Sequence, residues 1–503
     1  MKIVIRCDAS VAIGTGHVVR CLTLARALAE RRHQVSFVMR DLPGNMCDRV
    51  AAAGFAVHRL PAPNAPYDPE PGTPVHAVWA AVPAREDAEQ TVAALHGETQ
   101  DWIILDHYAF DAEWEIRVRE ACVRLMVVDD LADRPHLCEL LTDQNLGRHR
   151  ADYNGLLPDA CRRLIGPQFA LLRPEFASQR AAVLADRPRR GLNRVIIAMG
   201  GIDAPNATVT VLATLPQGLE ITVVMGSAAP HLDAVRALAA QKGARVLVDT
   251  PDMADLMGWA DVAIGGVGGS AWERSALGLP TLMVVLADNQ APAAAALAAT
   301  GAAVLIGRAE DAGLAAALHA ALADLAAPGA LGAMSAAAAA LCDGGGAPRV
   351  LRALEAAPMH LRPATLVDAK RIWNWRQASD SRLFRSGANP DWPDHAAWFD
   401  RALADASRRL YIAETAGRPV GHLRLDCTGD SGTVSLVIDP DYRGQGMAVR
   451  MLAAAEAEAR RLHLGALRAE VHLNNAASRT AFRQAGYRLE AEADGFLVLT
   501  LTL

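Results

Sequence analysis

The chain has 503 residues, of which 51% are hydrophobic, 21% are charged and 5% are aromatic. This composition can form the packed cores of two or three domains and excludes a disordered or collagen-like protein. Lysine and arginine number 50 against 56 aspartates and glutamates, a net charge of -6, which argues against a protein that binds nucleic acid or a membrane surface.

The eight cysteines are scattered and include no C-x-x-C pair or Cys/His cluster with zinc-ligand spacing. They predict a reducing compartment and no metal site. The amino terminus lacks the long apolar core of a signal peptide, and the alanine-rich stretches 291–307 and 312–341 are too short or too polar to span a bilayer. We therefore expect a cytoplasmic protein.

Short apolar runs alternate with helix-length segments from the first residue to about residue 307. This alternation is typical of parallel-sheet α/β domains with crossover helices, here including 18–31 and 232–242. Six prolines between Pro61 and Pro74 predict an exposed loop. The predicted strands are 2–7, 34–39, 102–105, 125–128, 194–199, 221–225, 245–248, 262–264, 281–285 and 303–306.

The pattern changes at a break over 356–358, beyond which tryptophan becomes frequent. Strands over 410–414, 420–426 and 433–438 follow one another through hairpin-like turns, which indicates an antiparallel, mixed α/β domain. We predict three domains. They cover residues 1–155, 156–357 and 358–503, the first two with parallel sheets.

A glycine loop from Asp8 to His17 follows the first strand and opens the first helix. Gly14 and Gly16 let a ligand approach the backbone, but the loop lacks the third glycine of a dinucleotide site and the Gly-Lys-Ser/Thr of a Walker loop. The helix dipole favours a neutral imidazole at His17, which suits general-base catalysis. A capping or packing histidine is the alternative at this point.

The second predicted domain carries three loops at strand ends. Gly200-Gly201 ends one strand, Gly268-Gly269-Ser270 ends another and enters a helix with Glu273, and Asn289-Gln290 follows a third. Glycine turns can bind a diphosphate through backbone N–H groups, and side-chain amides can bind a base or sugar, although such glycines are also ordinary turn residues. Two such domains predict a ligand in the cleft between them.

Two acidic segments stand at strand ends in the first domain. We expect Asp106-His107-Tyr108 to line the same cleft as His17. Asp129-Asp130-Leu131-Ala132-Asp133 resembles the acidic metal site of some nucleotide-sugar transferases. Those sites belong to a different architecture, so a loop that caps the following turn is the preferred interpretation.

These segments carry a family resemblance over residues 1–357. The chain is similar to the UDP-sugar hydrolase of pseudaminic acid biosynthesis in four segments: Arg6-x-Asp8-Ala9-Ser10-x-x-Ile13-Gly14-Thr15-Gly16-His17-Val18-x-Arg20-Cys21, Asp106-His107-Tyr108, Asp129-Asp130-Leu131-Ala132-Asp133-Arg134 and Asp143-Gln144-Asn145-Leu146.

The resemblance implies a GT-B-like (Rossmann-like) fold and cleavage of UDP-2,4-diacetamido-2,4,6-trideoxy-β-L-altropyranose to UDP and the free sugar. His17 would activate the water that displaces UDP, which leaves as a stable anion without a metal. Glu273 would bind the ribose hydroxyls. The implied hydrolase-site residues are Asp8, Gly14, Gly16, Asp106, His107 and Tyr108, and the implied UDP-binding residues are Gly200, Gly201, Gly268, Gly269, Ser270, Asn289 and Gln290.

In the third domain, a strand ending at Val437-Ile438 leads into Arg443-Gly444-Gln445-Gly446-Met447-Ala448 and a helix through residue 457. This resembles the turn of the GNAT acetyltransferases, in which successive N–H groups at a helix N-terminus bind the pyrophosphate of coenzyme A. The strand before the turn and the helix after it make an ordinary glycine turn the weaker interpretation.

The GNAT resemblance implies acetyl-CoA as co-substrate, with contacts from Asn474 and Ser478, and a strand that splays from its neighbour to pair with pantetheine. Many members place a tyrosine on the last helix as general acid for the departing thiolate. Phe482 stands at that position. Tyr487, Ser478, water or no acid at all remain alternatives.

Segments 373–376 and 395–399 resemble the N-acetyltransferase of the same pathway, which acetylates the 4-amino group of UDP-4-amino-4,6-dideoxy-N-acetyl-β-L-altrosamine. Glu414 and His422 are conceivable bases. The two resemblances fit together because the transferase product is the hydrolase substrate. We therefore expect small UDP-amino-sugar substrates, with no nucleic-acid or membrane partner and the oligomeric state open.

Two alternatives remain. One is a GT-B glycosyltransferase fused to an acetyltransferase of different substrate. Such a transferase often has an exposed apolar or basic membrane patch beside its acceptor groove, and no such patch is evident in the sequence. The other is a non-catalytic nucleotide-sugar sensor, which would predict loss of His17 or of the turn at 443–448, and both are present.

Overall fold

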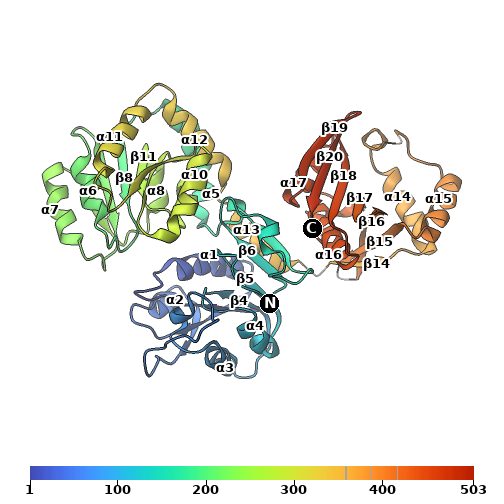
Figure 1. Ribbon diagram of the computed structural model, residues 1–503, viewed down its shortest axis with the longest axis horizontal. Helices are drawn as coiled ribbons and strands as arrows, with labels where there is room; N and C mark the ends of the chain where they lie inside the picture. Colours follow the sequence, from blue (N-terminus) through green and yellow to red (C-terminus); the bar gives the residue numbers. More distant parts are fainter. Residues whose placement is uncertain (357–358, 386, 416) are drawn as a thin grey trace. The chain divides into compact units, whose positions relative to one another are not determined.

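The computed structural model describes residues 1–356, 359–385, 387–415 and 417–503 (Figure 1). The chain divides into two compact units made of discontinuous segments. One comprises Met1–Arg134, Leu140–Arg148 and Arg163–Leu354, and the other comprises Pro135–Glu139, His149–Arg162 and Glu355–Leu503. The predicted break over 356–358 includes residues 357 and 358, which lie outside the described residues.

The first sheet has seven strands in the order β3-β2-β1-β4-β5-β6-β7, of which β1 to β6 run parallel. The order reverses between β1 and β4, so the loops that follow these two strands meet at a topological switch point, where open α/β sheets bind ligands. The strands are β1 (Lys2–Cys7), β2 (Gln34–Arg40), β3 (Ala56–Leu60), β4 (Gln100–Asp106), β5 (Cys122–Val128), β6 (Leu140–Asp143) and β7 (Arg162–Ile165).

Four helices accompany this sheet. Apolar residues spaced three apart on the first one, Val18, Cys21 and Leu24, are buried against the strands, as expected for an amphipathic crossover helix. The segment 61–74 forms no helix or strand and is largely exposed, as predicted. The helices are α1 (Gly16–Glu30), α2 (Cys47–Ala52), α3 (Ala84–Ala94) and α4 (Ala112–Val118).

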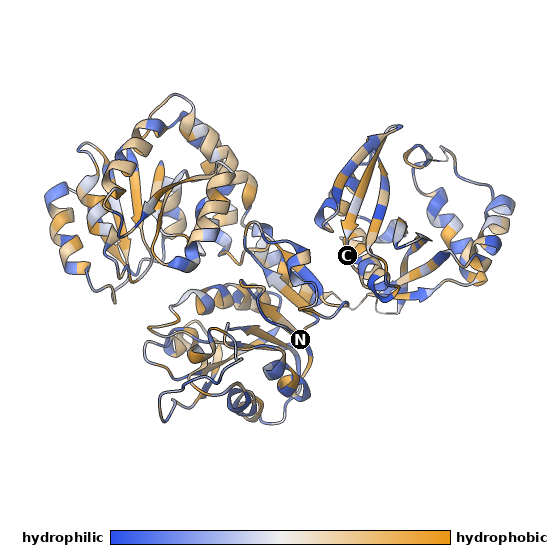
Figure 2. Cartoon of the chain, viewed as in Figure 1, coloured by the Kyte–Doolittle hydropathy of each residue, from blue (hydrophilic) through white to orange (hydrophobic). Residues whose placement is uncertain are grey.

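The second sheet has six parallel strands in the order β10-β9-β8-β11-β12-β13. Its order reverses between β8 and β11, which creates a second switch point. The strands are nearly all apolar because both faces are covered (Figure 2). They are β8 (Arg194–Ala198), β9 (Glu220–Met225), β10 (Arg245–Val248), β11 (Val262–Gly265), β12 (Thr281–Val285) and β13 (Ala303–Arg308).

The last of the helices that follow the second sheet, α13, packs against the first sheet. Val350 and Leu354 of α13 are fully buried in the same core as Ile3 and Ile5 of β1. The helices are α5 (Pro174–Asp186), α6 (Ala207–Thr214), α7 (Leu232–Lys242), α8 (Met253–Trp259), α9 (Ser270–Ala276), α10 (Ala291–Ala299), α11 (Leu314–Leu325), α12 (Ala330–Leu341) and α13 (Gly346–Glu355).

The third sheet is mixed, in the order β14-β15-β16-β17-β18-β20-β19, and every pairing is antiparallel except that of β17 with β18. The predicted α/β class, with two parallel sheets followed by a mixed sheet, is confirmed. Its strands are β14 (Met359–Pro363), β15 (Arg408–Thr415), β16 (Arg418–Thr428), β17 (Ser431–Ile438), β18 (Ala466–His472), β19 (Arg488–Ala493) and β20 (Phe496–Thr502).

Helices α14 (Ala369–Gln377), α15 (Trp392–Ala404), α16 (Met447–Arg461) and α17 (Ala476–Gln484) complete this part of the second unit. The unit also includes the segment His149–Arg162, where Arg150 pairs with the buried Glu456 of α16 at 2.5 Å. The predicted boundary at 155/156 falls inside that segment, and β7, which begins at Arg162, belongs to the first sheet.

Within the described residues, no single helix is both long and apolar enough to cross a membrane. The segments Leu314–Leu325 and Ala330–Glu355 meet the length and composition requirement only as a pair, which is bent by 98°.

Candidate active sites

The first switch point holds a histidine and an aspartate in direct contact. His17 lies in the first turn of α1, and Asp106 is the last residue of β4. His17 Nδ1 lies 2.6 Å from Asp106 Oδ1, and an ionised carboxylate only accepts hydrogen bonds, so the ring nitrogen is the donor. Burial opposes ionisation of Asp106, but Arg20 and His17 hold the pKa of its carboxyl well below the usual range. In the neutral ring, a proton on Nδ1 places the lone pair on Nε2.

Arg20 donates to the same carboxylate through two hydrogen bonds. Its Nε and Nη2 donate to the two oxygens of Asp106 at 2.6 and 2.7 Å, and its Nη1 donates to Asp130 at 2.5 Å. Asp130 also accepts a short hydrogen bond from the Tyr108 hydroxyl and one from Asn145 at 3.1 Å. The ends of β4, β5 and β6 are thereby joined to α1 in one hydrogen-bonded network.

Aromatic rings enclose His17 on one side. The Tyr108 ring lies edge-on to the imidazole at 4.5 Å between centroids, and Trp79 stacks on Tyr108 at 5.8 Å. His76 packs against Trp79 at 4.4 Å. Trp79 belongs to the short helix η1 (Ala77–Ala80), and His76 immediately precedes it. Asp106 and Tyr108, which were expected to line the same cleft as His17, contact its ring, whereas the sequence offered no signal for His76 or Trp79.

Asp8 and His107 belong to a buried charge network behind this site. Asp8 is fully buried and accepts hydrogen bonds from Arg6 at 2.8 Å and from the backbone N–H of Arg40 at 2.7 Å, while His107 Nε2 lies 3.4 Å from it. The Arg6 guanidinium and His107 outweigh the effect of burial and hold the pKa of the Asp8 carboxyl below its usual range. Asp8 therefore supports the loop from inside the fold.

The loop between Asp8 and His17 closes on itself. The Gly14 N–H donates to the Ser10 carbonyl at 2.8 Å, and Gly14 has a φ of +77°, a conformation that glycine adopts without strain. A side chain at Gly16 would meet no atom within 4 Å. Open space therefore surrounds the start of α1, beside His17.

We predict that Asp87→Ala destabilises the unit that contains the first sheet. Four hydrogen bonds from Arg6, Arg40 and Trp114 end on the Asp87 carboxylate, which is fully buried. Breaking a buried ion pair by removing one partner typically costs about 3–5 kcal/mol. Urea unfolding of the full chain measures the change, and Glu86→Ala, on the exposed face of the same helix, is the matched control. Equal unfolding midpoints for the two variants would contradict the assignment.

The second switch point brings the predicted UDP-binding loops to one sheet edge. Gly200-Gly201 follows β8, Gly268-Gly269-Ser270 follows β11, and Gln290 follows β12, which are three neighbouring parallel strands. Gly200 has a φ of +105°, and a side chain at any of the four glycines would meet no atom within 4 Å. The backbone at this edge is therefore open to a ligand.

Several side chains at this edge already contact other residues of the chain. Burial raises the pKa of the Glu273 carboxyl above its ordinary value, although Arg173 approaches it at 3.9 Å. Ser270 Oγ accepts from Arg274 at 3.2 Å, and Gln290 Oε1 accepts from the Leu286 N–H at 3.1 Å. The side chain of Asn289 lies outside what the structure describes.

The third site is the turn between β17 and α16. Gly444 and Gly446 both have a φ of +74°, and Gly446 is the N-cap of the 15-residue helix α16. A side chain at either glycine would meet no atom within 4 Å, so a ligand can approach the backbone at this helix start, where an anion is favoured. Arg443 donates to the Ala378 carbonyl and to Ser379 Oγ, each at 2.9 Å. Its guanidinium thus supports the turn.

The strand before this turn separates from its neighbour. β17 pairs with β18 only over Ser431–Thr433, although β17 continues to Ile438. Val437 and Ile438, the predicted pantetheine contacts, lie beyond the last paired residue. Met447 and Ala448 begin α16, and Gln445 donates to the Asp441 carbonyl at 2.9 Å. Asn474 is exposed, and the N–H of Ser478 is capped by Asn475 at the start of α17.

The structure narrows the alternatives for an acid and a base in this domain. Tyr487 is buried against Phe482 at 4.9 Å, and burial raises the pKa of its hydroxyl above the ordinary range. It belongs to the core. Glu414 is paired with Arg362 at 2.7 Å. Burial, with Arg424 and His395 nearby, lowers the pKa of the buried His422 to about 3.

Among the described residues, no three His, Cys, Asp or Glu side chains are grouped so as to hold a metal ion.

Comparison with known proteins identifies the carboxy-terminal part. Residues 369–487 match the model of the acetyltransferase (GNAT) family. The carboxy-terminal region is a GNAT acetyltransferase domain. GNAT domains take the acetyl group from acetyl-CoA, so the co-substrate expected from the turn is confirmed. Among solved structures, a spermidine N-acetyltransferase from Vibrio cholerae with CoA and spermine is 16% identical, with a TM-score of 0.27, and the match covers 29% of this chain and 95% of that chain.

The amino-terminal part is similar to a hydrolase. UDP-2,4-diacetamido-2,4,6-trideoxy-β-L-altropyranose hydrolase of Campylobacter jejuni is 27% identical over 259 residues, which are 51% of this chain and 81% of that protein. The spore coat polysaccharide biosynthesis protein SpsG of Bacillus subtilis is 34% identical over 151 residues, 29% of this chain and 44% of that protein. The chain is therefore an enzyme in which a hydrolase-related part is joined to the GNAT domain.

Proposed function

We propose that the chain catalyses two consecutive reactions of pseudaminic acid biosynthesis on one UDP-sugar. The GNAT domain acetylates the 4-amino group of UDP-4-amino-4,6-dideoxy-N-acetyl-altrosamine, and the amino-terminal part hydrolyses the product to UDP and the free diacetamido sugar. The similarity to the Campylobacter jejuni hydrolase supports the second substrate, and the GNAT match supports the first reaction.

The hydrogen bond between His17 and Asp106 carries the assignment of the hydrolytic step. His17 Nε2 takes a proton from water as the water oxygen bonds to the anomeric carbon and the bond from that carbon to the UDP oxygen breaks. Asp106, 2.6 Å from Nδ1, stabilises the imidazolium that results. UDP leaves as a stable anion, and the sugar keeps the oxygen of the water.

The loops at the second switch point would hold the UDP. The space beside the Cα atoms of Gly200, Gly201, Gly268 and Gly269 is open, and N–H groups of these two loops would bind the diphosphate. Glu273 would accept hydrogen bonds from the ribose hydroxyls, and Asn289 and Gln290 would contact the remaining nucleotide. These roles extend the family resemblance to this chain and give the nucleotide a place beside β8, β11 and β12.

In the GNAT domain, the turn at Gly444 and Gly446 would bind the pyrophosphate of acetyl-CoA, and the unpaired edge of β17 would pair with pantetheine. The neutral 4-amino group attacks the thioester carbonyl carbon, the C–N bond forms, and the C–S bond breaks. The proton of the amine leaves, and the coenzyme thiolate gains one from solvent.

Hydrolysis in water enriched in oxygen-18 tests the point of attack. We expect the label in the released sugar, measured by mass spectrometry, because the water oxygen bonds to carbon. Label in the β-phosphate of UDP would place the attack on phosphorus and contradict the role given to His17.

A further inference from the structure

We propose that Arg20 is a positioning residue. Through its two hydrogen bonds to the Asp106 carboxylate, it keeps the proton of the His17 ring on Nδ1. This inference rests on the proposed hydrolytic role of His17 and adds Arg20 to that site. His17 and Arg20 are three residues apart on α1, so both side chains project from one face of the helix towards the end of β4.

The hydrogen bonds of Asp106 fix the orientation of its carboxylate. The carboxylate is fully buried and accepts from His17 Nδ1 on Oδ1, from Arg20 on both oxygens, and from Cys21 Sγ on Oδ2 at 3.3 Å. The two Arg20 bonds are parallel and involve Nε and Nη2, an arrangement that fixes the plane of a carboxylate. Oδ1 is thereby held facing His17 Nδ1.

The charge of Arg20 matters as much as its geometry. Burial alone would drive Asp106 towards its neutral form, and Arg20 is the strongest influence that opposes this by lowering the pKa of the carboxyl. A protonated Asp106 could donate to Nδ1 instead of accepting from it. The ring proton would then move to Nε2, the nitrogen that must accept a proton from water.

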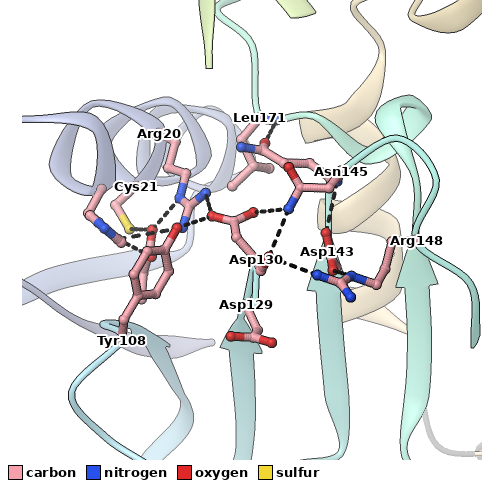
Figure 3. Close-up of polar contacts among 12 residues, drawn as sticks. Arg20, Cys21, Tyr108, Asp129, Asp130, Asp143, Asn145, Arg148 and Leu171 are labelled. Atoms are coloured by element: carbon pink, nitrogen blue, oxygen red, sulfur yellow. Dashed lines mark hydrogen bonds and ion pairs between the residues drawn. The ribbon is translucent and has the colours of Figure 1, made fainter. Parts of the chain in front are cut away.

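Arg20 is itself held by a second carboxylate (Figure 3). Asp130 accepts from Arg20 Nη1 at 2.5 Å, from the Tyr108 hydroxyl and from Asn145 Nδ2 at 3.1 Å. Asp130 follows β5, and its other two donors follow β4 and β6, so Asp130 links the guanidinium to the ends of these three strands. The chain of contacts runs from Asp130 through Arg20 and Asp106 to His17.

The inference is tested by determining the tautomer of His17 in the wild type and in three variants of the full chain. Long-range 1H–15N spectra of protein labelled with 15N-histidine distinguish a ring protonated on Nδ1 from one protonated on Nε2. The His17 signal among the 15 histidines is assigned by its loss in His17→Gln. The variants are Arg20→Met, Arg20→Lys and, as a control, Arg26→Met, whose arginine is exposed on the same helix.

We expect the wild type, Arg20→Lys and Arg26→Met to show the Nδ1–H form, and Arg20→Met to show the Nε2–H form. UDP release should fall by about 100-fold in Arg20→Met, with Arg20→Lys intermediate. A folded Arg20→Met that keeps the Nδ1–H form would overturn the inference, whatever its rate. Should Arg20→Met fail to fold, Arg20→Gln, a neutral donor of similar length, takes its place with the same expectation.

The two readouts separate this inference from the proposed function. A wild-type chain that releases no UDP from the diacetamido UDP-sugar contradicts the proposed hydrolysis, while the tautomer spectra still decide the role of Arg20. Hydrolysis by the wild type together with an unchanged tautomer in Arg20→Met contradicts the inference alone.

Discussion

His17→Gln lowers the rate of UDP release from the diacetamido UDP-sugar by about 10³-fold, because a glutamine amide cannot take a proton from water. Asp106→Asn has a comparable effect, since the amide no longer selects the Nδ1–H form of the ring. The rate of acetyl transfer, measured by thiol release from acetyl-CoA, stays unchanged in both variants because Asp106 and His17 belong to the other unit.

His319→Gln provides the matched control for this experiment, because His319 is an exposed residue of α11. UDP release by His319→Gln should equal that of the wild type. Release at the wild-type rate by His17→Gln would remove His17 from the reaction.

Gly446→Trp lowers kcat/KM for acetyl-CoA by about 100-fold or more and leaves UDP release unchanged. Gly446 caps α16 at a φ of +74°, and the space beyond its Cα is open. An indole there would strain the turn and fill the space expected to hold the coenzyme pyrophosphate, and a displacement of about 1 Å at a positioning site can cost 10²-fold.

Gly429→Trp is the control for the turn. Gly429 has a φ of +60°, also has no neighbour within 4 Å, and lies in the hairpin that precedes β17, at the opposite end of that strand from the turn. Both substitutions place a bulky side chain at a positive φ, so a loss that occurs only at Gly446 reports coenzyme binding. Equal losses of acetyl transfer in the two variants would show that strain, and not the coenzyme, explains the effect.

Strands made of nearly continuous apolar residues could be predicted from the sequence, because such runs are typical of parallel strands buried on both faces. Lys2–Cys7, Arg245–Val248 and Thr281–Val285 begin and end where the pattern placed them. β3, β6 and β7 were not predicted because charged or polar residues, among them Arg59, Asp143 and Arg162, interrupt their short apolar runs. Strands with such interruptions are defined by their partners in the sheet and have little sequence signal of their own.

The candidate sites could be predicted where they consist of one continuous segment, and not where residues distant in the chain meet. The glycine loop with His17 and the turn at 443–448 are continuous segments, so their residue types alone pointed to a base and to a phosphate-binding turn. Arg20 and Asp130 are 110 residues apart in the chain and meet only because β1, β4 and β5 are neighbours in the sheet. The sequence favours a turn-capping loop for 129–133, whereas the three side-chain donors to Asp130 come from elements that no local pattern connects.

One measurement tests the central claim that a single chain acetylates and then hydrolyses the same UDP-sugar. The purified wild-type chain is incubated with UDP-4-amino-4,6-dideoxy-N-acetyl-altrosamine, with and without acetyl-CoA, and the products are followed over time by mass spectrometry. We expect no UDP without acetyl-CoA, and with it an acetylated UDP-sugar that rises and then falls as UDP and the free diacetamido sugar appear. Release of UDP at the same rate without acetyl-CoA, or an acetylated UDP-sugar that accumulates undegraded, would contradict the account.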